Sequence, residues 1–318
     1  MSAVSDFKFI KKLRYLILRI LAKSKTISIP GFDKLPLFYV LRFFLKSLIN
    51  GDILNKAASM AFSFFLALFP ALIFIFSLIP YIPIENFQED LMFNIQLILP
   101  GPAYQFTEST IAELVLNSRF DLLSFGFIAM LFFSSNGVNT TIDNFNNSIL
   151  VEKKRSWLSQ RFTAFWMVAL LGTLVIVSMI MLFFGKTVLQ FLAHQEILSW
   201  AIAKLLTYLN YFIVVGFIYF TVSFFYYFGP SKKSRWKFFS AGSSLATLFI
   251  ILVSFVFENY INAFGTYNKF YGSLGAIMVI MLWFYFNCVI FLIGFELNTS
   301  LKRVHNDIKQ FIHMRRVS

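Results

Sequence analysis

Six long apolar segments follow one another along the chain. They cover roughly residues 58–80, 122–144, 161–184, 205–228, 238–262 and 273–299. A helix needs about 20 mostly apolar residues to cross a bilayer, and each segment has that length. The pattern predicts an all-α, polytopic membrane protein. Its expected divisions are an N-terminal segment at 1–55, a six-helix transmembrane domain at 56–300 and a basic tail at 301–318.

Amphipathic segments precede the first apolar segment. In residues 1–25 five basic side chains fall on one face of a helix and four Ile and Leu side chains fall on the opposite face; the basic ones are Lys8, Lys11, Lys12, Arg19 and Lys23. Residues 37–51 repeat the pattern, with Arg42 and Lys46 four positions apart. Such segments are typical of helices that lie in the membrane interface. Two arginines interrupt the first apolar stretch and no small-residue cleavage site follows, which argues against a signal peptide.

The connection at 81–121 is long for a membrane protein. Residues 85–99 and 103–117 each show the pattern of a short amphipathic helix, and a Pro-Gly-Pro-Ala stretch separates them. We expect two short helices here, on the side of the membrane opposite the chain termini.

The formal net charge of +13 is unevenly distributed. All but four of the 28 Lys and Arg residues precede the first apolar segment, follow the last, or lie beside the second and fourth connections. Because basic loops stay in the cytoplasm, both termini are predicted to be cytoplasmic. The basic face suits anionic lipid headgroups as partners. A nucleic-acid partner is the weaker interpretation, since the charge flanks membrane segments.

Polar residues interrupt the second apolar segment in "SSNGVNTTIDNFNN", residues 134–147. On a helix, Asn136, Asn139 and Asp143 fall within about 120° of one another and form a stripe. Two interpretations stay open. The stripe lines a polar pathway, because polar groups inside a membrane often mark one. Alternatively, its side chains hydrogen-bond to neighbouring helices and hold them together.

Other residues also interrupt the apolar pattern. Pro70 lies near the centre of the first segment and Gly137 lies within the stripe, and both are candidate helix breaks. Asn287, near the centre of the sixth segment, is a further candidate for the pathway. Glu258 and Glu296 fall near the ends of their segments, where a carboxylate beside a basic loop residue is the expected arrangement.

Motifs of catalysis and metal binding are missing from the sequence. There is no GxSxG or HExxH motif and no glycine-rich phosphate loop. Cys288 is the only cysteine, and the three histidines lack the spacing of metal ligands. The sequence therefore predicts neither an enzyme nor a cofactor.

Four stretches resemble one family of membrane proteins. Residues 271–298, "YGSLGAIMVIMLWFYFNCVIFLIGFELN", are similar to the signature of the YihY/BrkB family of bacterial inner-membrane proteins. Supporting stretches are "AASMAFSFFLALFPALIFI" at 57–75, "EKKRSWLSQR" at 152–161 and "YYFGPSKKSRWKFFSAG" at 226–242. The resemblance implies six spans with both termini inside, in a bacterial inner membrane, and it transfers no catalytic residue.

The family has been linked to a ribonuclease activity, to serum resistance and to transport of lipid or envelope material. We therefore expect a transporter or translocator of a solute, a lipid or an envelope component. The alternative is a non-transporting scaffold of the cell envelope, whose polar stripe binds helices or a partner subunit. A membrane nuclease is disfavoured, and a homo-oligomer or an envelope partner is left open.

Overall fold

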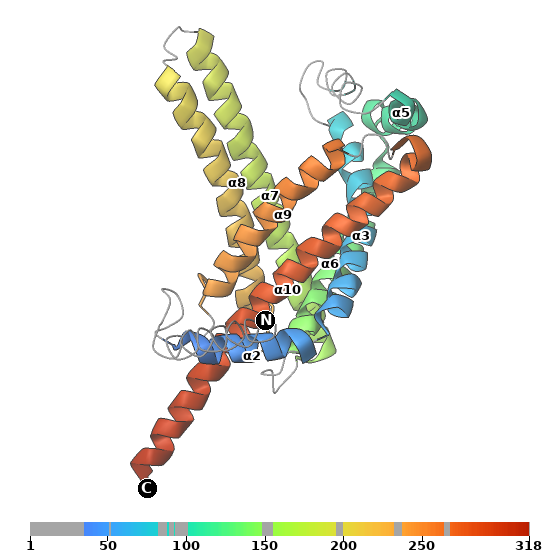
Figure 1. The fold of residues 1–318 in the computed structure, drawn as a ribbon. Helices are drawn as coiled ribbons and strands as arrows, with labels where there is room; N and C mark the ends of the chain where they lie inside the picture. The colour runs from blue at the N-terminus through green and yellow to red at the C-terminus, as the bar shows by residue number, and fades with distance from the viewer. Residues whose placement is uncertain are drawn as a thin grey trace, which may run out of the picture.

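The computed structural model describes residues 35–50, 52–81, 88, 92, 101–147, 155–194, 200–231, 237–263 and 268–317, and most of these residues form helices (Figure 1). The helices are α2 (Leu37–Asn50), α3 (Ile53–Leu78), the 3-10 turn η1 (Ile79–Tyr81), α5 (Gly101–Leu116), α6 (Phe120–Asn146), α7 (Trp157–His194), α8 (Trp200–Phe228), α9 (Ala241–Ala263) and α10 (Asn268–Val317). The expected helix at 1–25 lies outside the described residues, and so does nearly all of the one at 85–99.

The described helices include six that are long and apolar enough to cross a membrane, as the sequence predicted. Their limits differ from the predicted ones. The first spanning helix begins at Ile53, the third at Trp157, and α10 continues without interruption past residue 300 to Val317. The basic tail is therefore an extension of the last helix rather than a separate segment, and it projects beyond the other helices (Figure 1).

The helices α3 and α6 pack closely along their length. Glycines of α6 permit this approach: a Cβ added at Gly126 would lie 3.0 Å from the backbone nitrogen of Phe74, and one at Gly137 would lie 2.9 Å from the ring of Phe64. Neither Gly137 nor Pro70 ends its helix, because α6 and α3 run continuously through them. Both candidate breaks therefore lie inside continuous helices.

A cluster of large side chains joins α6 and α8 to α10. The ring of Phe145 stacks on that of Phe295 with centroids 3.9 Å apart, and it contacts Tyr226 edge-on. All three side chains are fully buried. The Tyr226 hydroxyl donates a hydrogen bond of 2.5 Å to the carbonyl of Phe291. Aromatic packing and hydrogen bonding thus fix the same three helices at one level.

The helix α2 lies across the bundle at one end, as an interfacial helix does (Figure 1). Its buried Val40 packs with Leu297 and Val304 of α10, whereas Arg42 and Lys46 are exposed on its outer face. We call this the basic end of the molecule: α2 lies there, α6 ends at Asn146 and α7 begins at Trp157. The assignment of this end to the cytoplasm stays a prediction.

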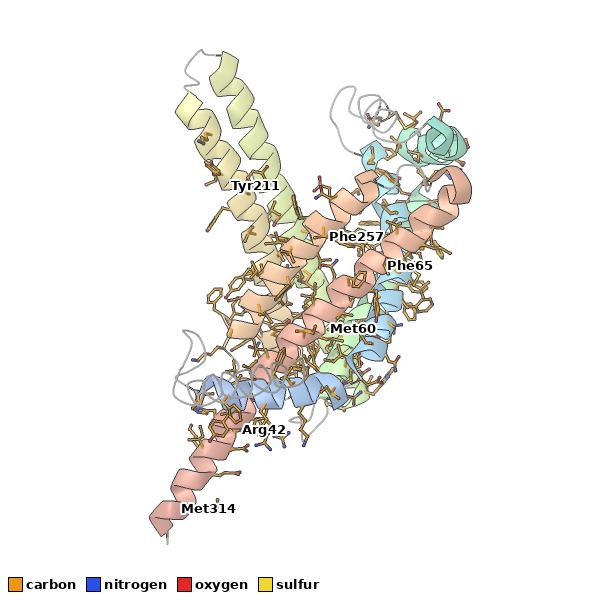
Figure 2. The ribbon with its side chains drawn as sticks, in the orientation of Figure 1. Arg42, Met60, Phe65, Tyr211, Phe257 and Met314 are labelled. Carbon is orange, nitrogen blue, oxygen red and sulfur yellow. The ribbon has the colours of Figure 1, made fainter. Side chains whose placement is uncertain are left out.

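The pair α7 and α8 diverges from α3, α6 and α10 with increasing distance from the basic end (Figure 1). Tyr211 lies on the diverging part of α8 (Figure 2). Its side chain is 69% exposed, and that of its neighbour Phe212 is 76% exposed. Near the basic end, by contrast, α6, α7 and α8 are packed together. The polar stripe lies in this packed half.

Candidate functional site

The polar stripe of α6 has an exposed centre and two contacting edges. Asn136 and Asp143 are exposed, while Asn139 and Thr140 on either side of them are half-buried. Asn136 lies ten residues from the end of α6 at Asn146, which is about 15 Å along a helix. The stripe therefore extends from the basic end to about half the depth of a membrane that is roughly 30 Å thick.

One edge of the stripe binds α7 through Gln160. The Gln160 amide nitrogen donates hydrogen bonds to Asp143 Oδ1 at 2.7 Å and to Asn139 Oδ1 at 3.0 Å. Its carbonyl accepts one from Asn146 at 3.5 Å. Gln160 and Asn146 are 8% and 2% exposed. This edge matches the helix-packing interpretation of the sequence.

The other edge of the stripe contacts α3. The hydroxyls of Ser63 and Thr140 lie 3.3 Å apart, and the Asn144 amide donates to the carbonyl of Lys56 at 3.1 Å. Ser59 is exposed beside them. Serine hydroxyls and a backbone carbonyl of α3 thus extend the polar surface of α6 sideways.

Arg161 of α7 lies beside Asn136, at the end of the stripe that is farthest from the basic end. Its guanidinium donates a hydrogen bond of 3.3 Å to Asn136 Oδ1. It also lies over the rings of Phe132 and Phe165, 5.1 and 5.2 Å from their centroids. Beyond this level the same face of α6 is aromatic, since Phe132 and Phe125 are 52% and 65% exposed. Arg161 therefore marks the boundary between a polar half and an apolar half of one face.

Arg155 holds the start of α7 to the turn after α8. Its guanidinium donates to three successive carbonyls, those of Phe228, Gly229 and Pro230, at 3.2, 2.8 and 3.2 Å. The Ser231 N–H donates to Asn146 Oδ1 at 2.9 Å, so α6 joins the same turn. Partial burial lowers the pKa of Arg155, which still leaves arginine charged at neutral pH. Two of the stretches that carry the family resemblance meet here.

Asn287 is not part of this site. It lies half-buried on α10, and its amide donates back to the carbonyl of Trp283 on its own helix at 2.8 Å. No described contact joins it to Asn136, Asn139 or Asp143. The structure brings together three of the four predicted pathway residues.

The two predicted interfacial carboxylates differ in their surroundings. Glu258 is exposed on α9. Glu296 is only 4% exposed, and its carboxylate accepts a hydrogen bond of 2.5 Å from Ser47 of α2. Glu296 therefore lies at the basic end of the molecule, where α2 covers it.

Sequence reasoning missed Gln160 and Arg161 as members of the site. Both lie in the first two turns of the third spanning helix, which directly follows the stripe in the chain. Consecutive helices with a short connection are antiparallel neighbours, so polar residues at the start of the third span were the available signal.

Two further features of the described residues concern metal binding and cavities. No three His, Cys, Asp or Glu side chains there are placed to hold a metal ion. An apolar groove of about 470 Å³ lies between α2, α3 and α10, with Ile53, Val289 and Ile293 among its walls. No residue of the stripe lines the groove, so the two are separate features.

Comparisons with known proteins agree with the resemblance seen in the sequence. The family model described as virulence factor BrkB matches residues 44–315. The ribonuclease-like protein YfkH of Bacillus subtilis (strain 168) is 30% identical over 275 residues, which are 82% of this chain and 95% of the relative. A UPF0761 membrane protein of Haemophilus influenzae (strain 86-028NP) is 27% identical over 270 residues, 84% of this chain and 96% of the relative. No solved structure matches the chain.

Proposed function

The chain belongs to the BrkB virulence-factor family of multi-pass membrane proteins, and we propose that it translocates an amphiphile, a lipid or envelope component, in a bacterial inner membrane. One observation carries the proposal. The centre of the polar stripe is accessible from outside the helix bundle, because Asn136 and Asp143 are exposed although they belong to a spanning helix.

Exposed amide and carboxylate groups are unfavourable against hydrocarbon, so water or polar headgroups are expected to cover them. Because its centre is exposed, the stripe is open on its outer side and not enclosed by helices. A molecule with a polar head and apolar tails fits such a surface, since its head can contact the stripe while its tails stay in the lipid. A small water-soluble solute would lack an enclosing wall on that side.

The experiment uses proteoliposomes with fluorescent phospholipids in both leaflets and a membrane-impermeant quencher added outside. Protein-free vesicles lose about half of the signal, and vesicles with an active translocator lose more with time. We expect N136L together with D143L to slow the second phase. F125L keeps a large apolar side chain on the apolar half of the same face and should leave the rate unchanged. Equal rates for the double variant and the wild type would overturn the proposal.

The scaffold function is favoured by a different observation, the Gln160 hydrogen bonds that use the stripe for helix packing. In that case a partner protein or a second copy of the chain covers the exposed centre. The same proteoliposomes would then show no translocation of any phospholipid class. A cysteine at Asn136 would form cross-links to another chain in native membranes.

A further inference from the structure

Arg161 is oriented against the usual rule for arginines near the end of a membrane helix. Long basic side chains normally extend toward the nearer interface, where the charge is hydrated. The partners of Arg161 all lie on the other side of it. Phe165 is one turn further into α7, and Asn136 and Phe132 are about 15 and 21 Å from the end of α6. The guanidinium therefore points toward the centre of the membrane.

The described contacts satisfy only a small part of this cation. A guanidinium has five N–H donors, and Arg161 uses one of them for protein, the bond of 3.3 Å to Asn136. Two aromatic rings stabilise the charge through cation–π contacts but accept no strong hydrogen bond. No carboxylate among the described residues forms an ion pair with it. The nearby Asp143 accepts hydrogen bonds from Gln160 and Asn139 instead.

We propose that Arg161 binds the phosphate of an anionic phospholipid headgroup and so selects the cargo of the stripe. The role of Arg161 in selecting cargo rests on the proposed function. The binding of phosphate by Arg161 does not depend on that function. The planar fork of a guanidinium matches phosphate oxygens in a bidentate way. A phosphate there would take up the open N–H donors and neutralise the charge.

The position of Arg161 also fits a lipid better than a soluble phosphate ester. Arg161 is half-buried between exposed phenylalanine rings, with Phe132 52% and Phe165 37% exposed. Acyl chains that extend from a headgroup at this level would contact the apolar half of the face. Toward the basic end, the amides and hydroxyls of α6 and α3 would contact the polar remainder of the headgroup.

The test measures binding in detergent micelles, by energy transfer from the protein's tryptophans to pyrene-labelled phosphatidylglycerol. Trp157 and Trp166 lie within about two turns of Arg161 and serve as donors. We expect R161Q to lower the affinity for this lipid at least about tenfold, because charge-assisted hydrogen bonds are lost. R161K keeps the charge but lacks the planar fork of the guanidinium, so its affinity should lie between those of R161Q and the wild type.

Arg303 provides the matched control. It too forms a cation–π contact, with its guanidinium 5.0 Å from the Phe43 centroid, but it lies under α2 at the basic end. R303Q removes the same charge and should change the affinity by less than about threefold. If R161Q and R303Q lower the affinity equally, the lipid is held only by non-specific electrostatic attraction to the basic residues, and the proposal is overturned. If R161Q does not fold, the comparison of R161K with R303K decides in the same way.

Competitors identify the source of the phosphate. Unlabelled phosphatidylglycerol should displace the probe, whereas dioleoylglycerol, which lacks phosphate, and soluble glycerol 3-phosphate, which lacks acyl chains, should displace it poorly. Displacement by glycerol 3-phosphate as strong as by the lipid would overturn the lipid assignment. Because this assay needs no bilayer, specific binding without translocation would contradict the proposed function alone. Translocation without specific binding would contradict the Arg161 site alone.

Discussion

The crossing of α9 and α10 leaves no room for a methyl group, and this gives a sharp test of the packing. A Cβ added at Gly242 would lie 2.1 Å from the carbonyl oxygen of Gly294 and 2.6 Å from the Asn298 side chain. The Asn298 side chain also links α10 to the start of α9. It accepts a hydrogen bond of 2.8 Å from the Gly242 N–H and donates one of 2.8 Å to the Ser240 hydroxyl. We therefore choose the substitution G242A.

The expected loss of stability follows from these contacts. Overpacking of a tight site costs about 1–3 kcal/mol, and here a backbone carbonyl, not a flexible side chain, must move. Displacing Asn298 would weaken two hydrogen bonds, each worth roughly 0.6 kcal/mol inside a membrane protein. We expect G242A to destabilise the protein by about 2–4 kcal/mol in total.

The chain contains its own controls. At Gly172 and Gly216, in α7 and α8, a Cβ would meet nothing within 4 Å. There the change to alanine should be neutral or should stabilise by up to about 1 kcal/mol through helix propensity. Thermal unfolding in detergent, followed by tryptophan fluorescence, should place G242A at least about 4 °C below both controls. If G242A melts together with G172A and G216A, the close crossing of α9 and α10 is wrong.

Three further predictions concern single contacts, each measured as the unfolding midpoint in the same detergent. R155A should lower stability by about 2 kcal/mol or more, because three carbonyls lose a charged donor; no change would mean that α7 is not fixed to the turn after α8. S47A should cost about 1–3 kcal/mol, because the buried Glu296 loses a hydrogen-bond donor, whereas S159A, at an exposed serine, should have no effect. Q160A should cost about 1–2 kcal/mol by leaving buried polar groups of α6 without their partner, and an unchanged midpoint would contradict the packing role of that edge.

The number and approximate places of the spanning helices were predictable because they depend on length and hydropathy alone. Their ends were not. The first spanning helix begins at Ile53, five residues before the predicted apolar segment, and the residue at its N-cap position, Asp52, makes no side-chain capping bond. The continuation of α10 past residue 300 was missed because hydropathy falls there while the helix persists.

The candidate site was predictable only in part, for a related reason. Helical periodicity placed Asn136, Asn139 and Asp143 on one face, and the structure shows them there. Their partners lie on other helices, and periodicity within one helix cannot identify them. The bond between Ser47 and Glu296 joins residues 249 positions apart, and it depends on how α2 crosses the bundle.

Accessibility of Asn136 to water decides whether the polar stripe is a pathway or only a helix-packing surface. The only cysteine, the buried Cys288, would be replaced by serine, and single cysteines would be placed at Asn136, Asp143, Phe125 and Ile142. A membrane-impermeant maleimide would then be applied to inside-out vesicles. Phe125 is exposed on the same face in the apolar half, and Ile142 is fully buried, so both controls should stay unlabelled.

We expect the cysteine at Asn136 to be labelled, because polar molecules reach the middle of the stripe. Labelling that stops at Asp143, with Asn136 as protected as Phe125, would contradict it. The stripe would then be a helix-packing surface with a hydrated end, and the translocation proposal would lose the observation on which it stands.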